Sequence, residues 1–417
     1  MPTLPMSLNA LVVFIFVATY LGIAGGRLPG LQINRTGIAI FGAIMLMVAG
    51  ALTVEQATAT IDYSTLLLLF GLMILSAQLR VAGFYRLVAR QVLAFAHRPF
   101  TLLVGIVLAS ALLSSVFAND IVCLAFTPAL CEVAQTARRN PLPYLIALAT
   151  SSNIGSVATL IGNPQNMFIG QASGLDFGSY LLVMAPVTLF GVAANALVVR
   201  WIWRAEFTTG AENAGLTPLP HELVAFKPDY RSIKKTLLIT GLLLAAFLLG
   251  WPRDLCALAA AALLLPSRRN PSEKLFALVD WNLIMLFIAL FVIIGALQQR
   301  GLMEQALAGL AGAGIHLDQP VVLVSLCTLL SNLVSNVPAV LLMQDIPGAT
   351  ARLWYLLAMA STLAGNLTLL GSIANLIVAE KAAGYGITLS FIDYVKVGLP
   401  LTLITVIAGT FWVLFAA

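Results

Sequence analysis

Two stretches of eight residues decide the fold: residues 112–119 read LLSSVFAN, and residues 329–336 read LLSNLVSN. Each belongs to a long apolar stretch, residues 99–134 and 319–344, that polar residues interrupt near its middle. Other segments match in the same order and at similar spacing. They are residues 60–72 with 278–290, and residues 158–166 with 367–375. The sequence therefore contains an internal repeat.

The chain around these segments is too apolar for a water-soluble protein. Of its 417 residues, 60% are hydrophobic and only 9% are charged, whereas soluble domains contain roughly 25% charged residues. A helix that spans a bilayer needs about 20 mostly apolar residues. We therefore expect an all-α polytopic membrane protein with about 10 transmembrane helices plus two re-entrant hairpins, in two inverted-topology repeats. The expected spans are residues 8–26, 36–52, 63–79, 141–171, 178–203, 234–250, 253–266, 281–299, 353–380 and 390–416.

The distribution of Lys and Arg predicts the orientation of these spans, because basic residues prefer cytoplasmic loops. When each hairpin returns to its own side, 19 of the 22 Lys and Arg fall on one side, and only Arg253, Arg300 and Arg352 fall on the other. Both termini are then outside a bacterial-type inner (plasma) membrane. The net charge of +5 is too small and too spread to indicate a nucleic-acid partner.

Repeat and linker divide the chain into three parts: residues 8–203, a polar cytoplasmic linker at residues 204–233, and residues 234–417. Each repeat holds five spans and one interrupted stretch, so the second repeat enters the membrane in the opposite direction. Secondary transporters with this architecture bind substrate near the midplane, where broken helices of the two halves meet. Residues 80–98 alternate Arg with apolar residues, which predicts an amphipathic interfacial helix.

The interrupted stretches supply the first candidate site residues: Asn119, Asp120, Ser335 and Asn336. Polar side chains at this depth are costly unless they serve a cavity or a partner. An Asn amide can offer its oxygen to a cation or its nitrogen to an oxyanion. The alternative is an Asn that caps a helix at a tight turn, but its matched position in both repeats favours a functional role.

Two spans are interrupted at matching positions. Pro164 removes a backbone donor and Gly162 permits unwinding, and the second copy keeps the Gly at position 371 without the Pro. Such a break turns carbonyl groups and helix ends toward an ion or substrate, although a Pro-kinked helix without a ligand is the alternative. The candidate binding residues here are Thr159, Gly162, Asn163, Asn166, Thr368, Gly371, Ser372 and Asn375. Polar residues upstream, at 151–153 and 361–362, suit helix–helix hydrogen bonding as well as ligand contact.

Asp120 is the acidic residue at a predicted midplane break. A carboxyl group withdrawn from water can take up and release protons, which suits proton coupling. Pairing with a bound cation, or capping of a half-helix, is the alternative. Asp62 and Asp280 each precede a span and are better explained as helix N-caps. No metal site or cofactor is expected, and the coupling ion is expected to be H⁺, with Na⁺ as the alternative.

These motifs resemble the ion transporter superfamily that includes arsenite efflux permeases, NhaD-type sodium/proton antiporters, citrate-metal transporters and divalent-anion/sodium symporters. The likeness covers about residues 8–417 and is most specific at residues 117–120 (FAND), 149–155 (ATSSNIG), 161–166 (IGNPQN) and 335–338 (SNVP). It implies a first hairpin that opens inward, a second that opens outward, and a scaffold domain that holds a mobile transport domain.

The hairpin tips depart from the divalent-anion symporters, in which each tip carries Ser-Asn-Thr for carboxylate and sodium. Here the triplets are Ala118-Asn119-Asp120 and Ser335-Asn336-Val337. A carboxylate beside the site would repel a dianion. The FAND tip is similar to the arsenite permeases, whose substrate is an uncharged metalloid hydroxide. The resemblance therefore implies proton-coupled efflux of arsenite or antimonite. Sodium- or proton-coupled carboxylate or inorganic-anion transport and Na⁺/H⁺ antiport are the alternatives.

The expected partners are the lipid bilayer and a small metalloid or ion substrate. The sequence is compatible with a homodimer and, through the arsenite permease resemblance, with a cytoplasmic ATPase subunit. An inverted repeat with broken helices favours a carrier over a channel. At span depth the sequence has no Ser/His pair and no His/Glu metal cluster that would indicate an enzyme.

Overall fold

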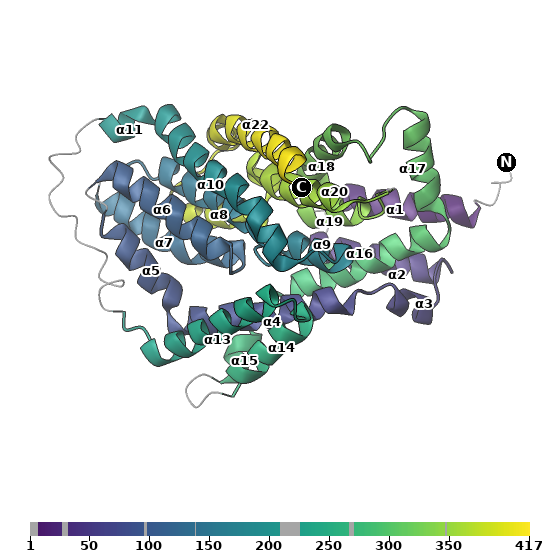
Figure 1. The fold of residues 1–417 in the computed structure, drawn as a ribbon, viewed down its shortest axis with the longest axis horizontal. Helices are drawn as coiled ribbons and strands as arrows, with labels where there is room; N and C mark the ends of the chain where they lie inside the picture. The colour runs from purple at the N-terminus through teal and green to yellow at the C-terminus, as the bar shows by residue number, and fades with distance from the viewer. Residues whose placement is uncertain are drawn as a thin grey trace.

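The computed structural model describes residues 7–26, 32–95, 98–137, 139–208, 226–266, 271–346 and 348–417, and these residues form helices joined by loops (Figure 1). The expectation of an all-α chain is confirmed. Most of the predicted cytoplasmic linker, residues 209–225, lies outside the described residues.

Five described helices are long and apolar enough to cross a membrane: α1 (Leu8–Gly25), α4 (Tyr63–Ala82), α10 (Phe177–Ile202), α16 (Trp281–Gln299) and α22 (Phe391–Ala416). Three shorter helices are also apolar: α2 (Arg35–Val48), α6 (Pro99–Ser114) and α18 (Pro320–Val334). The remaining helices are α3 (Val54–Ala59), α5 (Phe84–Leu93), α7 (Asn119–Thr136), α8 (Leu142–Ser156), α9 (Pro164–Ser173), α11 (Arg204–Thr208), α13 (Tyr230–Leu248), α14 (Arg253–Leu264), α15 (Ser272–Phe276), α17 (Leu302–Gly312), α19 (Asn336–Leu342), α20 (Ala351–Leu363) and α21 (Ile373–Ala383). Two short 3₁₀ turns, η1 (Ala364–Asn366) and η2 (Leu369–Gly371), separate α20 from α21.

The two halves of the chain contain helices in the same order. In the second half, α13, α14, α16 and α17 follow one another as α1, α2, α4 and α5 do in the first. Packing partners correspond as well, because α4 packs against α14 while its counterpart α16 packs against α2. How each half is oriented in a membrane stays a prediction.

The helices pack in two groups. The scaffold group consists of α1, α2, α4, α13, α14 and α16. The hairpin group consists of α6 to α10 and α18 to α22, with α7 packed against α21 and α10 against α22. In Figure 1, α4, α13 and α14 run side by side at the bottom of the view, and α6, α7 and α8 lie together at the left. The candidate residues at the hairpin tips therefore belong to one group and face the other.

Local sequence signals explain where several helices begin and end. Asp62 and Asp280 cap α4 and α16, since the carboxylate of each accepts a hydrogen bond from the backbone N–H of Thr65 (3.2 Å) and Leu283 (3.0 Å) respectively. The N-cap interpretation of both residues is confirmed. Gly83, with φ of 82°, ends α4 and starts α5, which is therefore shorter than the predicted stretch 80–98.

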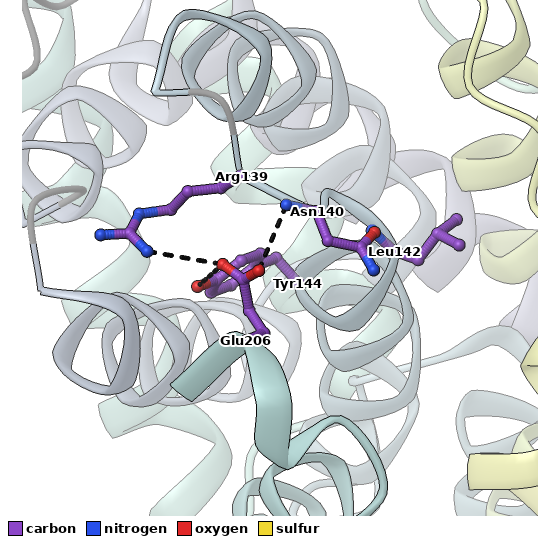
Figure 2. Close-up of polar contacts among 5 residues, drawn as sticks. All are labelled: Arg139, Asn140, Leu142, Tyr144 and Glu206. Carbon is purple, nitrogen blue, oxygen red and sulfur yellow. Dashed lines mark hydrogen bonds and ion pairs between the residues drawn. The ribbon is translucent and has the colours of Figure 1, made fainter. Parts of the chain in front are cut away.

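The first part of the linker is anchored to the hairpin group, as Figure 2 shows. Glu206 of α11 pairs with Arg139 (3.6 Å) in the connection between α7 and α8. The same carboxylate accepts hydrogen bonds from the Tyr144 hydroxyl (3.1 Å) and the Asn140 backbone (3.3 Å). These contacts fix α11 against the connection that leads from the first hairpin to the first broken span.

Candidate functional site

The two hairpin tips and the two broken spans surround a small cavity of about 50 Å³, here called the central cavity. The predicted break in the first span lies between α8 and α9. The second span is broken as well, by η1 and η2, although it lacks a Pro. Lining the central cavity are Asn119, Asp120, Asn153, Asn163, Pro164, Gln165, Asp280, Leu283, Ser335, Asn336, Val337, Thr362, Ser372, Ile373 and Ala374.

Half of the candidate residues line this cavity, and half lie behind it. The residues that line the cavity are Asn119, Asp120, Asn163, Ser335, Asn336 and Ser372. The residues outside its lining are Thr159, Gly162, Asn166, Thr368, Gly371 and Asn375. Those six contact residues of the breaks or of the hairpins instead, and they do so at matching positions in the two halves.

Asn166 and Asn375 donate hydrogen bonds to carbonyl groups of each break. The amide of Asn166 donates to the carbonyl oxygens of Ser156 (3.2 Å) and Thr159 (3.3 Å). The amide of Asn375 donates to those of Gly365 (2.7 Å) and Thr368 (3.1 Å), which are the repeat counterparts of Ser156 and Thr159. Both Asn side chains are fully buried, so they satisfy backbone acceptors that would otherwise be costly to bury.

Thr159 and Thr368 connect each break to the neighbouring hairpin. The Thr159 hydroxyl donates to the carbonyl oxygen of Ser115 (2.5 Å), and the Thr368 hydroxyl donates to the side-chain oxygen of Asn332 (3.0 Å). Ser115 and Asn332 are also repeat counterparts. A Cβ at Gly162 would clash with the backbone of Ser156, and a Cβ at Gly371 would clash with the side-chain oxygen of Asn332. These four residues hold the hairpins and breaks together.

Asn153 is a central polar residue that the candidate set leaves out. Its side-chain oxygen accepts hydrogen bonds from Asn119 (2.9 Å) and Ser372 (3.0 Å), and its nitrogen donates to Asn366 (2.9 Å) and Asn375 (3.1 Å). It therefore links the first hairpin tip to the second break. Its counterpart in the second repeat is Thr362, which is also polar. This pair of polar residues at corresponding positions was the sequence signal that could have identified both as site residues.

Thr362 has the equivalent place on the other side of the cavity. Its hydroxyl accepts a hydrogen bond from Asn163 (3.1 Å) and donates to Asn166 (3.3 Å). At the nearby second tip, the Asn336 amide is within hydrogen-bond distance of the carbonyl oxygens of Ser361 (3.1 Å) and Gly371 (3.2 Å) when its nitrogen is turned toward them. Each hairpin tip is thus bonded to the polar segment just before a break.

Two carboxylates give the central cavity its charge. Asp120 and Asp280 both line it, and both also line an adjoining cavity of about 220 Å³. Among the residues that the structure describes, no Lys or Arg lines the central cavity. Arg80 lines the adjoining cavity only. The position of Asp280 at the site was not predicted, because the sequence indicated only its role as a cap.

Two further cavities lie next to one another between the central cavity and one surface. The adjoining cavity shares Arg80, Leu124 and Leu278 with a cavity of about 620 Å³. Exposed basic side chains of Arg80, Arg86 and Lys381 line this larger cavity, which we call the basic vestibule. Glu132 is the acidic residue in its lining. The central cavity is thus separated from the basic vestibule by the adjoining cavity and the side chains that the cavities share.

A separate cavity of about 360 Å³ is lined by Asp62, Phe168 and Gln298, and within the described part of the chain it shares no lining residue with the central cavity. Gln298 is the repeat counterpart of Arg80 and donates a hydrogen bond to Asp345 (2.7 Å). By their shared lining residues, the central cavity thus adjoins the cavities on the basic side and not this one.

Comparison with known proteins agrees with this architecture. The citrate transporter family model matches residues 11–354. The silicon efflux transporter LSI3 of rice (Oryza sativa subsp. japonica) is 31% identical over 91% of this chain and 92% of its own length. A putative transporter arsB of Dictyostelium discoideum is 24% identical over 95% of this chain and 89% of its own.

Solved structures support the fold. The crystal structure of the Alcanivorax borkumensis YdaH transporter is similar with a TM-score of 0.53 and 15% identity, over 98% of this chain and 97% of that one. The resemblance to the ion transporter superfamily is thus confirmed, and the protein is a multi-pass membrane protein whose family and relatives are transporters. It belongs to the citrate transporter family.

Proposed function

We propose that the protein exports a small uncharged metalloid hydroxide, arsenite or antimonite, in exchange for protons. One observation carries this proposal: the central cavity offers amides, hydroxyls and two carboxylates, and none of its described lining residues is Lys or Arg. Carboxylates repel anions, whereas the hydroxyl groups of a neutral hydroxide can both donate and accept hydrogen bonds. Asn119, Ser335 and Asn336 supply suitable partners.

The size of the central cavity supports a small substrate. At about 50 Å³, it exceeds the roughly 10–15 Å³ that one water molecule needs by the same kind of measure. A central atom with a few hydroxyl groups suits such a space. Citrate would need the cavity to widen or to merge with the adjoining one, where Asp120 and Asp280 would still oppose its charge.

Proton exchange is assigned to Asp120. It lies at the first hairpin tip and lines the cavity that adjoins the basic vestibule. We place the vestibule in the cytoplasm, because the positive-inside rule puts the basic residues there. In this scheme the hairpin group moves against the scaffold group, so that protons enter as the substrate leaves. The homodimer and the ATPase subunit remain predictions.

Silicic acid is the second candidate. It is also an uncharged hydroxide, and the rice relative at 31% identity is named a silicon efflux transporter. The name arsB on the Dictyostelium relative favours the arsenic assignment. Carboxylate transport, which the family description suggests, requires a co-bound cation to offset the two carboxylates. A Na⁺/H⁺ antiporter would use the same carboxylates for a cation alone.

The test is transport by the purified protein in proteoliposomes with an imposed pH gradient. We expect arsenite to accumulate on the acidic side, so that it moves against the proton flow, and antimonite to compete with it. Silicic acid, citrate with and without Mg²⁺, and Na⁺ are tested in the same vesicles. Arsenite flux that equals the flux in protein-free liposomes would overturn the substrate assignment, and proton-driven flux of another solute would identify its replacement.

A further inference from the structure

Asp280 belongs to the scaffold group, yet it shares the site with Asp120 of the first hairpin. Its carboxylate is held at the start of α16 by the backbone N–H of Leu283 (3.0 Å). Asp280 and Asp120 together line the central cavity and the adjoining one. Two carboxylates from different helix groups therefore line the same small space.

The charged and titratable groups that face Asp120 come from several elements. Asp280 precedes α16, Arg80 ends α4, Tyr85 lies on α5, and Cys123 follows on α7 itself. Arg80 is exposed in the basic vestibule, where water and salt screen its attraction. Asp280 is half-buried, so its repulsion of an ionised Asp120 is screened less.

The tip of the second hairpin has no carboxylate at the position that corresponds to Asp120. Val337 takes the place of Asp120 in the repeat. It is buried, and its helix α19 packs directly against α16. Helix α7 instead packs against α5, α8 and α21. The uncharged tip is thus closed onto the scaffold helix that Asp280 caps, while the tip with Asp120 borders the adjoining cavity.

We propose that Asp280 is a positioning residue that makes closure of the first hairpin onto α16 depend on neutralisation of Asp120. An ionised Asp120 is held away from α16 by the Asp280 carboxylate. A proton on Asp120 removes this repulsion, and a bound solute that donates hydrogen bonds to or pairs with the Asp120 carboxylate offsets it, so the hairpin closes with either the proton or the solute bound. The inference rests on the proposed function in that the first hairpin must open and close during transport, but it does not depend on which solute is carried.

Accessibility of the first hairpin tip tests this directly. Ala118→Cys is introduced into a chain whose four native cysteines are replaced, and the protein is placed in lipid nanodiscs. Its labelling rate by a charged maleimide is divided by that of Ala94→Cys, an exposed position at the C-cap of α5, to remove the pH dependence of thiol chemistry. We expect the ratio to fall about tenfold between high and low pH.

The Asp280→Asn variant tests whether the charge of Asp280 causes the pH dependence of the labelling ratio. Asn still caps α16, but the repulsion is gone, so the ratio is low at every pH and its pH dependence is lost. Asp280→Glu keeps the charge and should retain the tenfold change. Asp176→Asn, which alters the N-cap of α10 outside the site, should also retain it.

Two results overturn the proposal: an unchanged tenfold dependence in Asp280→Asn, or its loss in Asp176→Asn as well. The outcome is distinguishable from failure of the proposed function. Labelling that follows the expected pattern in a protein that does not move arsenite leaves this inference standing and removes only the substrate. Arsenite transport together with unaltered labelling in Asp280→Asn removes this inference alone.

Discussion

The two hairpin tips occupy matching positions in the two halves, yet they differ in charge, packing and backbone. The first tip carries Asp120, lies beside the cavity that adjoins the basic vestibule, and has an ordinary φ of −55° at Ala118. The second carries Val337, is packed onto α16, and has a φ of 78° at Ser335. The repeat thus gives the two halves corresponding helices, and the halves differ in charge, packing and backbone at the hairpin tips.

The two breaks, unlike the two hairpin tips, are nearly alike. Asn166 and Asn375 bond corresponding carbonyl groups, and Thr159 and Thr368 reach corresponding hairpin residues. A structural task must be performed in both halves, since each break leaves backbone groups unpaired inside the protein. A coupling group is needed on one side only. Substitutions at the tips and at the breaks can therefore separate the coupling role of one half from the structural role of both.

Moving the carboxylate from one tip to the other should have the largest effect. Asp120→Asn removes the proton-exchanging group, so we expect pH-driven arsenite exchange to fall by about a hundredfold or more. Adding Val337→Asp should not restore it, because Val337 is only 8% exposed in a closed hairpin and a charge there is costly to bury. Initial exchange rates in proteoliposomes at several pH values give the answer.

Val337→Thr serves as the control for that experiment, since it changes the shape of the second tip little and adds no charge. It should exchange arsenite at nearly the rate of the unaltered protein. Restored, pH-dependent exchange in the double variant would mean that the two tips are interchangeable and that their inequality has no role in coupling.

Removing an amide from either break should affect stability more than transport chemistry. Asn166→Ala and Asn375→Ala each remove two amide hydrogen bonds to buried carbonyl oxygens. The oxygens of Thr159 and Thr368 still accept a hydrogen bond from the backbone N–H of Gly162 and Gly371. At about 1–3 kcal/mol for an unsatisfied buried group, each variant should lose about 1–3 kcal/mol of unfolding free energy. Chemical denaturation in detergent micelles measures this, with the exposed Asn282→Ala as a control expected to change it by under about 0.5 kcal/mol.

Similar losses for both Asn variants would support equivalent breaks. If only Asn166→Ala lowered the unfolding free energy, the Pro-containing first break would depend on its Asn and the second break would not. Unchanged stability in both would show that water or a neighbouring donor replaces the amide, and their burial would need another explanation.

The hairpins and breaks could be predicted because polar residues stand out in an apolar chain. The stretches 99–134 and 319–344 correspond to α6 with α7 and to α18 with α19. The second break forms without a Pro because the backbone is already extended at Thr368 and Ser372, and the Ser372 hydroxyl caps α21. Gly and Ser are therefore enough to break the second span, whereas the first span also has a Pro at its break.

The division of the site could not be predicted from residue types. An Asn that binds a ligand and an Asn that satisfies backbone carbonyls look identical in sequence, and only packing places Asn119 at the cavity and Asn166 behind it. Asp280 was identified as an N-cap, which it is. Its second position, beside Asp120, depends on how two helix groups separated by much of the chain pack together.

The backbone difference between the tips leads to the smallest predicted effect. Ser335 has φ of 78° and ψ of 160°, a region that is nearly exclusive to Gly and costs other residues about 1–3 kcal/mol. Ser335→Gly relieves this cost but adds about 0.5–1 kcal/mol of chain entropy to folding, so we expect a net stabilisation of about 1 kcal/mol. Ala118→Gly at the first tip has no strain to relieve and should destabilise the protein by about 0.5–1 kcal/mol. Chemical denaturation of both variants measures the difference between the tips. Equal destabilisation by the two Gly substitutions would mean that the second tip stores no strain, and its closed packing on α16 would then have to arise from side chains alone.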